Sequence, residues 1–141
     1  MRAICMIVAL TQLASCDLNS GPDRVRVLGS IAGYNDDDPQ ITLDPDGRNV
    51  TVAVTTYGSG CHTLGETEVE ISGLEAKITP FDYTAAAGTG CDRMLRSFVH
   101  SVTLSFASEG TARIQVRGID NRGSAGDTLV IERAVELRIS D

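Results

Sequence analysis

Apolar and polar residues alternate with a period of two along most of the chain from Arg24 onward, which is the pattern of strands that bury one face. In these runs valine, isoleucine, leucine and phenylalanine share one parity, and charged or hydroxyl residues take the other. Eight segments are predicted as strands: 24–27, 40–43, 49–55, 66–71, 74–83, 97–106, 112–117 and 129–139. Turn sequences rich in Gly, Asp and Pro separate them, and no apolar helical period persists in this region. The chain is therefore expected to form an all-β antiparallel sandwich of seven or eight strands.

This list of short strands resembles that of bacterial immunoglobulin-like domains. The resemblance concerns architecture, because the chain contains no tryptophan and so lacks the Cys-Trp-Cys hallmark of antibody domains. An immunoglobulin-like β-sandwich is the first expectation. A jelly roll and a partly open barrel remain as alternatives.

The first fifteen residues differ in composition from the rest of the chain. Arg2 is their only charge, and an almost unbroken apolar run extends from Ala3 to Leu10. This run is shorter than the roughly 20 apolar residues that a membrane-spanning helix requires. A positive start, a short apolar run and small residues afterwards are typical of a secretory signal, expected as an N-terminal signal helix.

The signal ends in Leu13-Ala14-Ser15-Cys16, which resembles the lipobox of bacterial lipoproteins. The resemblance implies that Cys16 receives a diacylglyceryl group, that the chain is cut just before it, and that the new amino terminus is often acylated. It divides the chain into a lipoprotein signal peptide (1–15), the lipidated cysteine with a short tether (16–23) and the sandwich domain (24–141). The bilayer is then one partner, and the location is the bacterial cell envelope, on the periplasmic side or the cell surface. The alternative is a signal without lipidation that leaves Cys16 as a thiol.

Four cysteines are present, and their count supports this interpretation. Cys5 leaves with the signal and Cys16 carries lipid, so Cys61 and Cys91 remain and can pair. Each of these two follows a glycine-rich turn, GSGC or GTGC, where backbones approach closely. We predict a Cys61–Cys91 disulfide.

The formal net charge of the 141-residue chain is −7, from 12 basic and 19 acidic residues. Loss of Arg2 with the signal leaves 11 against 19, or −8. So acidic a domain is repelled by nucleic acid and by an anionic bilayer, which excludes nucleic acid as a partner.

A metal site is the most tempting chemistry. Cys61, His62, Cys91, Asp92 and His100 include soft and borderline ligands for zinc or copper. However, no CxxC or HxxxH spacing is present, and an exported protein favours the disulfide. His100 shares the parity of Phe98 and Val102, so a hydrogen-bonded core position is the simpler interpretation. No cofactor or metal is expected.

Acidic segments have similarly simple explanations. Residues 35–38 and 44–47 offer oxygens to calcium, but the second segment, Asp-Pro-Asp-Gly, lacks the full calcium-loop pattern and is a strong reverse-turn sequence. Glu66, Glu68 and Glu70 share one strand face at intervals of about 7 Å, which indicates a solvated or edge-protecting face.

No catalytic residue is predicted, because the chain has no GxSxG elbow and His100 and Ser101 point to opposite faces of one strand. Three tyrosines lie near predicted turns, and Tyr57 and Tyr83 are expected to flank a disulfide-braced rim suited to binding. The sequence thus predicts a lipid-anchored, non-enzymatic interaction or structural domain that contacts an unknown envelope protein. The alternative is a metal-binding envelope lipoprotein (zinc, copper or calcium), with a hydrolase less supported.

Overall fold

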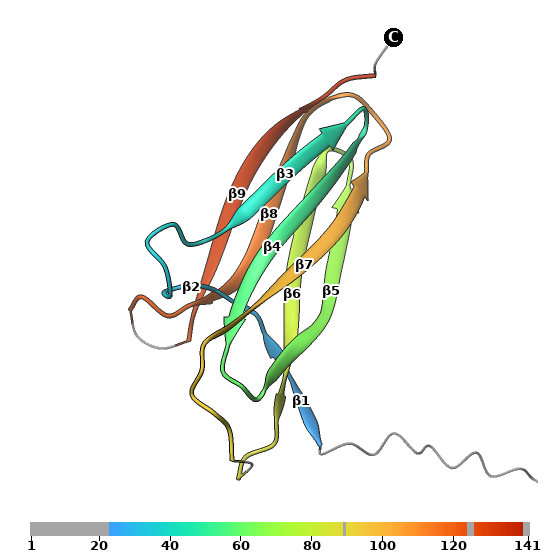
Figure 1. Cartoon of the computed structure of the whole chain (residues 1–141). Helices are drawn as coiled ribbons and strands as arrows, with labels where there is room; N and C mark the ends of the chain where they lie inside the picture. Colours follow the sequence, from blue (N-terminus) through green and yellow to red (C-terminus); the bar gives the residue numbers. More distant parts are fainter. Residues whose placement is uncertain (1–22, 89, 124–125, 140–141) are drawn as a thin grey trace, which may run out of the picture.

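The computed structural model describes residues 23–88, 90–123 and 126–139. Within these ranges the chain forms nine strands and no helix, so none of the described residues belongs to a helix able to span a membrane (Figure 1). The strands are β1 (Arg24–Leu28), β2 (Ser30–Ala32), β3 (Ile41–Asp46), β4 (Asn49–Gly58), β5 (His62–Ser72), β6 (Glu75–Ala85), β7 (Arg96–Ser105), β8 (Gly110–Asp120) and β9 (Asp127–Leu137). The predicted all-β class is confirmed. The expected signal (1–15), Cys16 and the tether up to residue 22 lie outside the described residues.

Two packed layers make up the sandwich (Figure 1). The first layer has the order β3–β4–β7, and the second has the order β5–β6–β8–β9, with β1 paired to the second half of β6. Most pairs are antiparallel, as expected, but β6 and β2 each pair in parallel with β8. Parallel neighbours need a crossover connection, and β7, which lies in the opposite layer, provides it.

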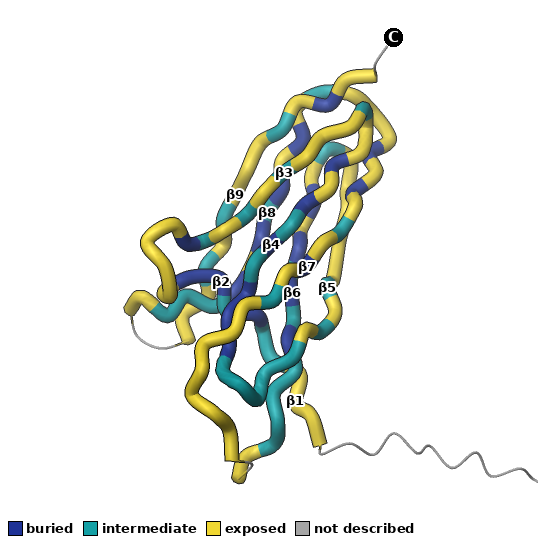
Figure 2. The backbone as a smooth tube through the Cα atoms, viewed as in Figure 1, coloured by how far each residue is buried: buried dark blue, intermediate teal, exposed yellow. Residues whose placement is uncertain are grey.

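The core lies between the layers and follows the predicted parity. Even-numbered residues of β4, β6, β7 and β8 face inward, and Figure 2 shows buried and exposed positions alternating along β4 and β8. The fully buried members include Val50, Val52, Val54, Ile78, Leu104, Ile114 and Val116. Val69 and Ile71 pair with inward residues of β6, but they are 38% and 43% exposed because β5 is an edge strand. Apolar burial of this kind is the main stabilising term for the fold.

The ninth strand, β2, is the element that the sequence did not predict. After β1, which pairs with β6, the backbone makes its last hydrogen bond to β6 at Gly29, whose N–H donates to Pro80 O at 2.9 Å. The same residue then bonds to β8, because Ile119 N–H donates to Gly29 O at 2.9 Å. A Cβ on Gly29 would lie 2.6 Å from Thr56 Cγ2, and one on Gly118 would lie 2.6 Å from Ile31 Cγ2. Two glycines therefore allow β2 to pass between its neighbours.

The Asp-Pro-Asp-Gly turn falls later than expected. Asp44, Pro45 and Asp46 belong to β3, and the hairpin closes at Gly47 and Arg48, where Gly47 has φ +62°. Pro45 is tolerated in the strand because β3 lies at a sheet edge, where a missing N–H leaves no ladder bond unmade.

The passage of β2 generates a stability prediction. Gly118→Ala should lower the free energy of unfolding by about 1–3 kcal/mol, because the new methyl group overlaps Ile31 in a packed core. Chemical denaturation of the protein measures the change in unfolding free energy. Gly90→Ala is the matched control, since a Cβ there meets nothing within 4 Å. Equal stability of the two variants would contradict the packing account.

Candidate functional site

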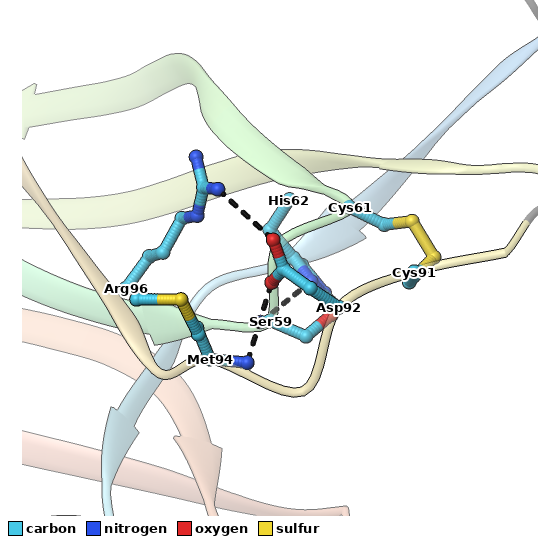
Figure 3. A network of polar contacts seen from close by, with 7 residues as sticks. All are labelled: Ser59, Cys61, His62, Cys91, Asp92, Met94 and Arg96. Atoms are coloured by element: carbon cyan, nitrogen blue, oxygen red, sulfur yellow. Dashed lines mark hydrogen bonds and ion pairs between the residues drawn. A yellow bond between two sulfur atoms is a disulfide. The ribbon is translucent and has the colours of Figure 1, made fainter.

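A disulfide joins two loops at one end of the sandwich (Figure 3). Cys61 lies in the connection between β4 and β5, and Cys91 lies in the connection between β6 and β7. Their Cα atoms are 5.2 Å apart, and the predicted pairing is present. We call the two segments that this bond joins, 59–62 and 91–96, the disulfide rim.

Hydrogen bonds within each segment hold the polar groups of the rim in place (Figure 3). His62 Nδ1 accepts from Ser59 N–H at 3.0 Å. Asp92 accepts from Met94 N–H at 3.3 Å and from the Arg96 guanidinium at 3.2 Å. Gly60 N–H donates to Asp92 O at 3.2 Å, and a Cβ at this glycine would overlap the Asp92 carboxylate. The hydrogen bond between the two segments therefore adds to the covalent link.

This arrangement does not assemble the metal ligands that the sequence suggested. Cys61 and Cys91 use their sulfurs for each other, so neither offers a thiolate. His100 lies in β7, inside the sandwich, away from the rim. Among the residues described, no three His, Cys, Asp or Glu side chains are grouped to hold a metal ion.

Tyr57 does not flank the rim as predicted. It is only 5% exposed, its hydroxyl donates to Asp38 Oδ1 at 2.8 Å, and its ring lies 5.1 Å from that of Tyr34. The loop between β2 and β3 therefore covers Tyr57. Tyr83 donates its hydroxyl to Glu66 Oε2 at 2.6 Å. The expectation of paired tyrosines at the rim is wrong for Tyr57.

The Asp38 carboxylate organises the loop that covers Tyr57. Its Oδ2 accepts from the backbone N–H groups of Tyr34 and Asn35, both at 2.8 Å. Burial by itself would raise the pKa of Asp38, but these two bonds and that from Tyr57 outweigh it and lower the pKa. Both oxygens are thus engaged inside the protein, which supports a turn in residues 35–38 over a calcium loop.

A second polar cluster, the core histidine network, lies between the two layers. His100 Nε2 is 3.1 Å from Asp82 Oδ1 and 3.2 Å from Thr56 Oγ1, and its Nδ1 is 2.9 Å from Thr67 Oγ1. The side chains of His100 and Asp82 are each 1% exposed. Asp82 Oδ2 is buried without a hydrogen-bond partner among the described residues. The prediction that His100 is a hydrogen-bonded core residue is confirmed.

Thr67, His100 and Asp82 form the hydroxyl, imidazole and carboxylate sequence that nucleophilic catalysis uses. The chemistry also requires access to substrate, and here the imidazole and the carboxylate are sealed in the core. A surface hollow on the outer face of the second layer does not include these residues: it has a volume of about 330 Å³ and is lined by Glu68, Glu70, Lys77, Thr79, Gln115, Arg117 and Val130. The network is therefore structural in this conformation.

The glutamate row borders that hollow on the edge strand β5. The Arg26 guanidinium lies 3.5 Å above the Phe81 ring and forms ion pairs with Glu66 and Glu68. The hydrogen bond from the Tyr83 hydroxyl is the largest cause that lowers the pKa of Glu66, and the Arg26 charge lowers it further. These groups are exposed and paired, in agreement with a solvated, charge-protected edge.

Sequence reasoning missed Asp82, Thr56 and Thr67 as partners of His100. Their parity was an available signal, since Asp82 shares the inward parity of Ile78, and Thr56 shares that of Val54. Parity places a polar residue inside but does not say which strand lies opposite it. Pairing across the layers becomes visible only in the fold.

The disulfide carries one stability prediction. Closing a loop of this length should contribute about 3–4 kcal/mol in the chain-entropy model, so Cys61→Ser/Cys91→Ser should lose that much unfolding free energy. Urea denaturation of the protein with and without reductant measures this loss. The double variant is its own control, because reductant should leave it unchanged. Identical curves for oxidised and reduced wild-type protein would contradict the prediction.

The core histidine network generates a second stability prediction for this part of the structure. His100→Leu should cost about 3–5 kcal/mol of unfolding free energy, because it leaves the Asp82 carboxylate buried and unpaired. Adding Asp82→Leu should recover part of the loss, since a packed apolar pair needs no hydrogen bonds. Arg96→Ala, which removes an exposed ion pair, should change stability by less than about 1 kcal/mol. A double variant no more stable than His100→Leu would refute the unpaired-carboxylate explanation.

The comparisons with known proteins identified no relative of this chain. A scan of protein-family models, a search of curated proteins and a search of solved structures each found no match to the chain.

Proposed function

We propose that this protein is a lipid-anchored component of the bacterial cell envelope whose small immunoglobulin-like sandwich acts as a non-enzymatic interaction or structural domain. The observation that carries the proposal is the sequence Leu13-Ala14-Ser15-Cys16 after a short apolar run, which resembles the lipobox of bacterial lipoproteins. In this proposal residues 1–15 are removed and acyl chains on Cys16 hold the domain at the bilayer. Stable anchoring takes two membrane-binding signals, and a diacylglyceryl cysteine supplies two chains at one residue.

The Cys61–Cys91 disulfide supports an exported location. Disulfides form and persist in oxidising compartments such as the periplasm and the cell surface, and they are rare in the cytosol. The same bond weighs against the metal-binding alternative, because that alternative depends on free thiolates at these two positions.

The non-enzymatic part of the proposal is supported by where the reactive groups lie. The imidazole and the carboxylate of the core histidine network are each 1% exposed, and the polar side chains of the rim bond to one another. Exposed faces and loops then remain for contact with an envelope protein. The net charge of −7 opposes nucleic acid as a partner.

Labelling with palmitate tests the anchor directly. Bacteria that produce the full chain with labelled palmitate should yield a labelled protein that sediments with membranes. Cys16→Ala should abolish both label and sedimentation, because the thiol that accepts the diacylglyceryl group is gone. Cys5→Ala is the matched control and should keep both, since Cys5 lies within the segment that is removed. An unlabelled wild-type protein, or label that persists in Cys16→Ala, would overturn the proposal.

A further inference from the structure

We propose that the tip of the disulfide rim, Met94 and Leu95, inserts into the interfacial region of the bilayer that carries the Cys16 anchor. The inference rests on the proposed function, because lipidation at Cys16 is what brings this end of the domain to a membrane. It adds that the protein has a membrane-contacting surface of its own, and that this surface sets the orientation of the domain.

The first support is position. The connection that carries Met94 starts beside the point where the described chain begins: Ala86 N–H donates to Asp23 O at 3.0 Å, and Arg24 pairs with Ala85. β1 and the loop between β6 and β7 lie at one end of the sandwich, and the described C-terminal residues lie at the other (Figure 1). The rim therefore lies at the end from which the anchor segment departs.

The second support is the length of the chain between anchor and domain. Six residues separate Cys16 from Asp23, so even a fully extended chain spans at most about 25 Å between their Cα atoms. β8 alone has 11 residues and is about 36 Å long. An acylated Cys16 thus brings the rim end close to the bilayer, and the opposite end cannot take its place.

The third support is chemistry. Met94 is 68% exposed, the largest value among the large hydrophobic residues described, and its neighbour Leu95 is 52% exposed. Val25 and Leu64, each 51% exposed, belong to strand segments that pair with the same end of β6. Arg93 and Arg96 flank the apolar pair. Apolar side chains with adjacent arginines suit the boundary between acyl chains and phosphates, where the arginine stems extend so that their charges reach the headgroups.

Local charge also favours this end over the rest of the molecule. Asp23, Arg24, Asp92, Arg93 and Arg96 give three positive against two negative charges, or +1, whereas the whole chain carries −7. An anionic bilayer therefore repels most of the domain but not the rim.

The fourth support is that the tip is held in place before it meets a membrane. Met94 N–H and the Arg96 guanidinium both donate to Asp92, and the disulfide fixes the adjacent Cys91 to the neighbouring loop (Figure 3). A loop that is already ordered loses less conformational entropy when it binds.

Tryptophan fluorescence tests the inference, since the chain contains no tryptophan. Lipidated Met94→Trp protein, produced in bacteria from the full chain, is reconstituted in vesicles of phosphatidylcholine and phosphatidylglycerol, with and without brominated acyl chains. We expect blue-shifted emission that the brominated chains quench. Ile139→Trp is the matched control: Ile139 is 58% exposed and lies beyond β9 at the opposite end, so its emission should stay water-like and unquenched.

Tryptophan itself favours membrane interfaces, so a second reporter leaves the loop unchanged. Val25→Trp should be quenched when Met94 and Leu95 are native, and quenched less when both are replaced by serine. Equal quenching at positions 94 and 139, no quenching at 94, or no effect of the serine substitutions would overturn the inference. Palmitate label on the same preparation separates the two proposals. Labelled, vesicle-bound protein with an unquenched tip would refute the insertion and leave the anchor intact. Unlabelled protein in the supernatant would refute the anchor and also the insertion, which depends on the anchor.

Discussion

The contact between His100 and Asp82 is the constraint on which the arrangement of the two layers depends. His100 belongs to β7 in the first layer, and Asp82 belongs to β6 in the second layer, so their 3.1 Å contact crosses the core. Apolar packing tolerates small displacements, whereas hydrogen bonds require particular atoms at particular distances. A one-residue slip of β7 would turn His100 to the solvent face and leave the Asp82 carboxylate buried without this contact. We infer that this network fixes the register between the layers, while the surrounding valines and isoleucines supply most of the stabilisation.

The remaining specificity comes from close backbone approaches and one covalent bond. Gly29 and Gly118 allow β2 to pass between β8 and β4, which links the layers along one side of the fold. The Cys61–Cys91 bond fastens two loops at the end of the sandwich from which the N-terminal segment leaves. The histidine network and the disulfide therefore act at different places, the first within the core and the second at the rim. Their contributions to stability should be close to additive, because they share no partners.

Alternation along the chain was sufficient to predict most strands and their inward faces, since one face of each is buried. It predicted the even-numbered residues of β4, β7 and β8 as inward-facing, with His100 among those of β7. It did not predict β2, because three residues cannot show a period, and this strand exists only through pairing with β4 and β8. Pro45 led to the prediction of a turn at residues 44–47, but a proline, although typical of turns, is equally acceptable in an edge strand such as β3. For the candidate site, cysteine count and glycine flanks predicted the disulfide, but the covering of Tyr57 by the β2–β3 loop depends on Asp38, a contact that no local pattern encodes.

The proposed anchor at Cys16 and the proposed insertion of the rim tip would together determine which surfaces a partner can reach. Two points of attachment at one end would leave the domain less rotational freedom than a tether alone. The rim would then face the lipid, and the outer faces of both layers and the C-terminal end would be open to other proteins. Those two outer faces differ in chemistry: the second layer presents charged side chains such as Glu68, Lys77 and Arg117, whereas the outer side of β7 presents mainly serine and threonine. Charge complementarity speeds encounter and discriminates among partners. The outer face of β5, β6 and β8 is therefore the better place to seek the surface that recognises an envelope protein, rather than the loops around the disulfide.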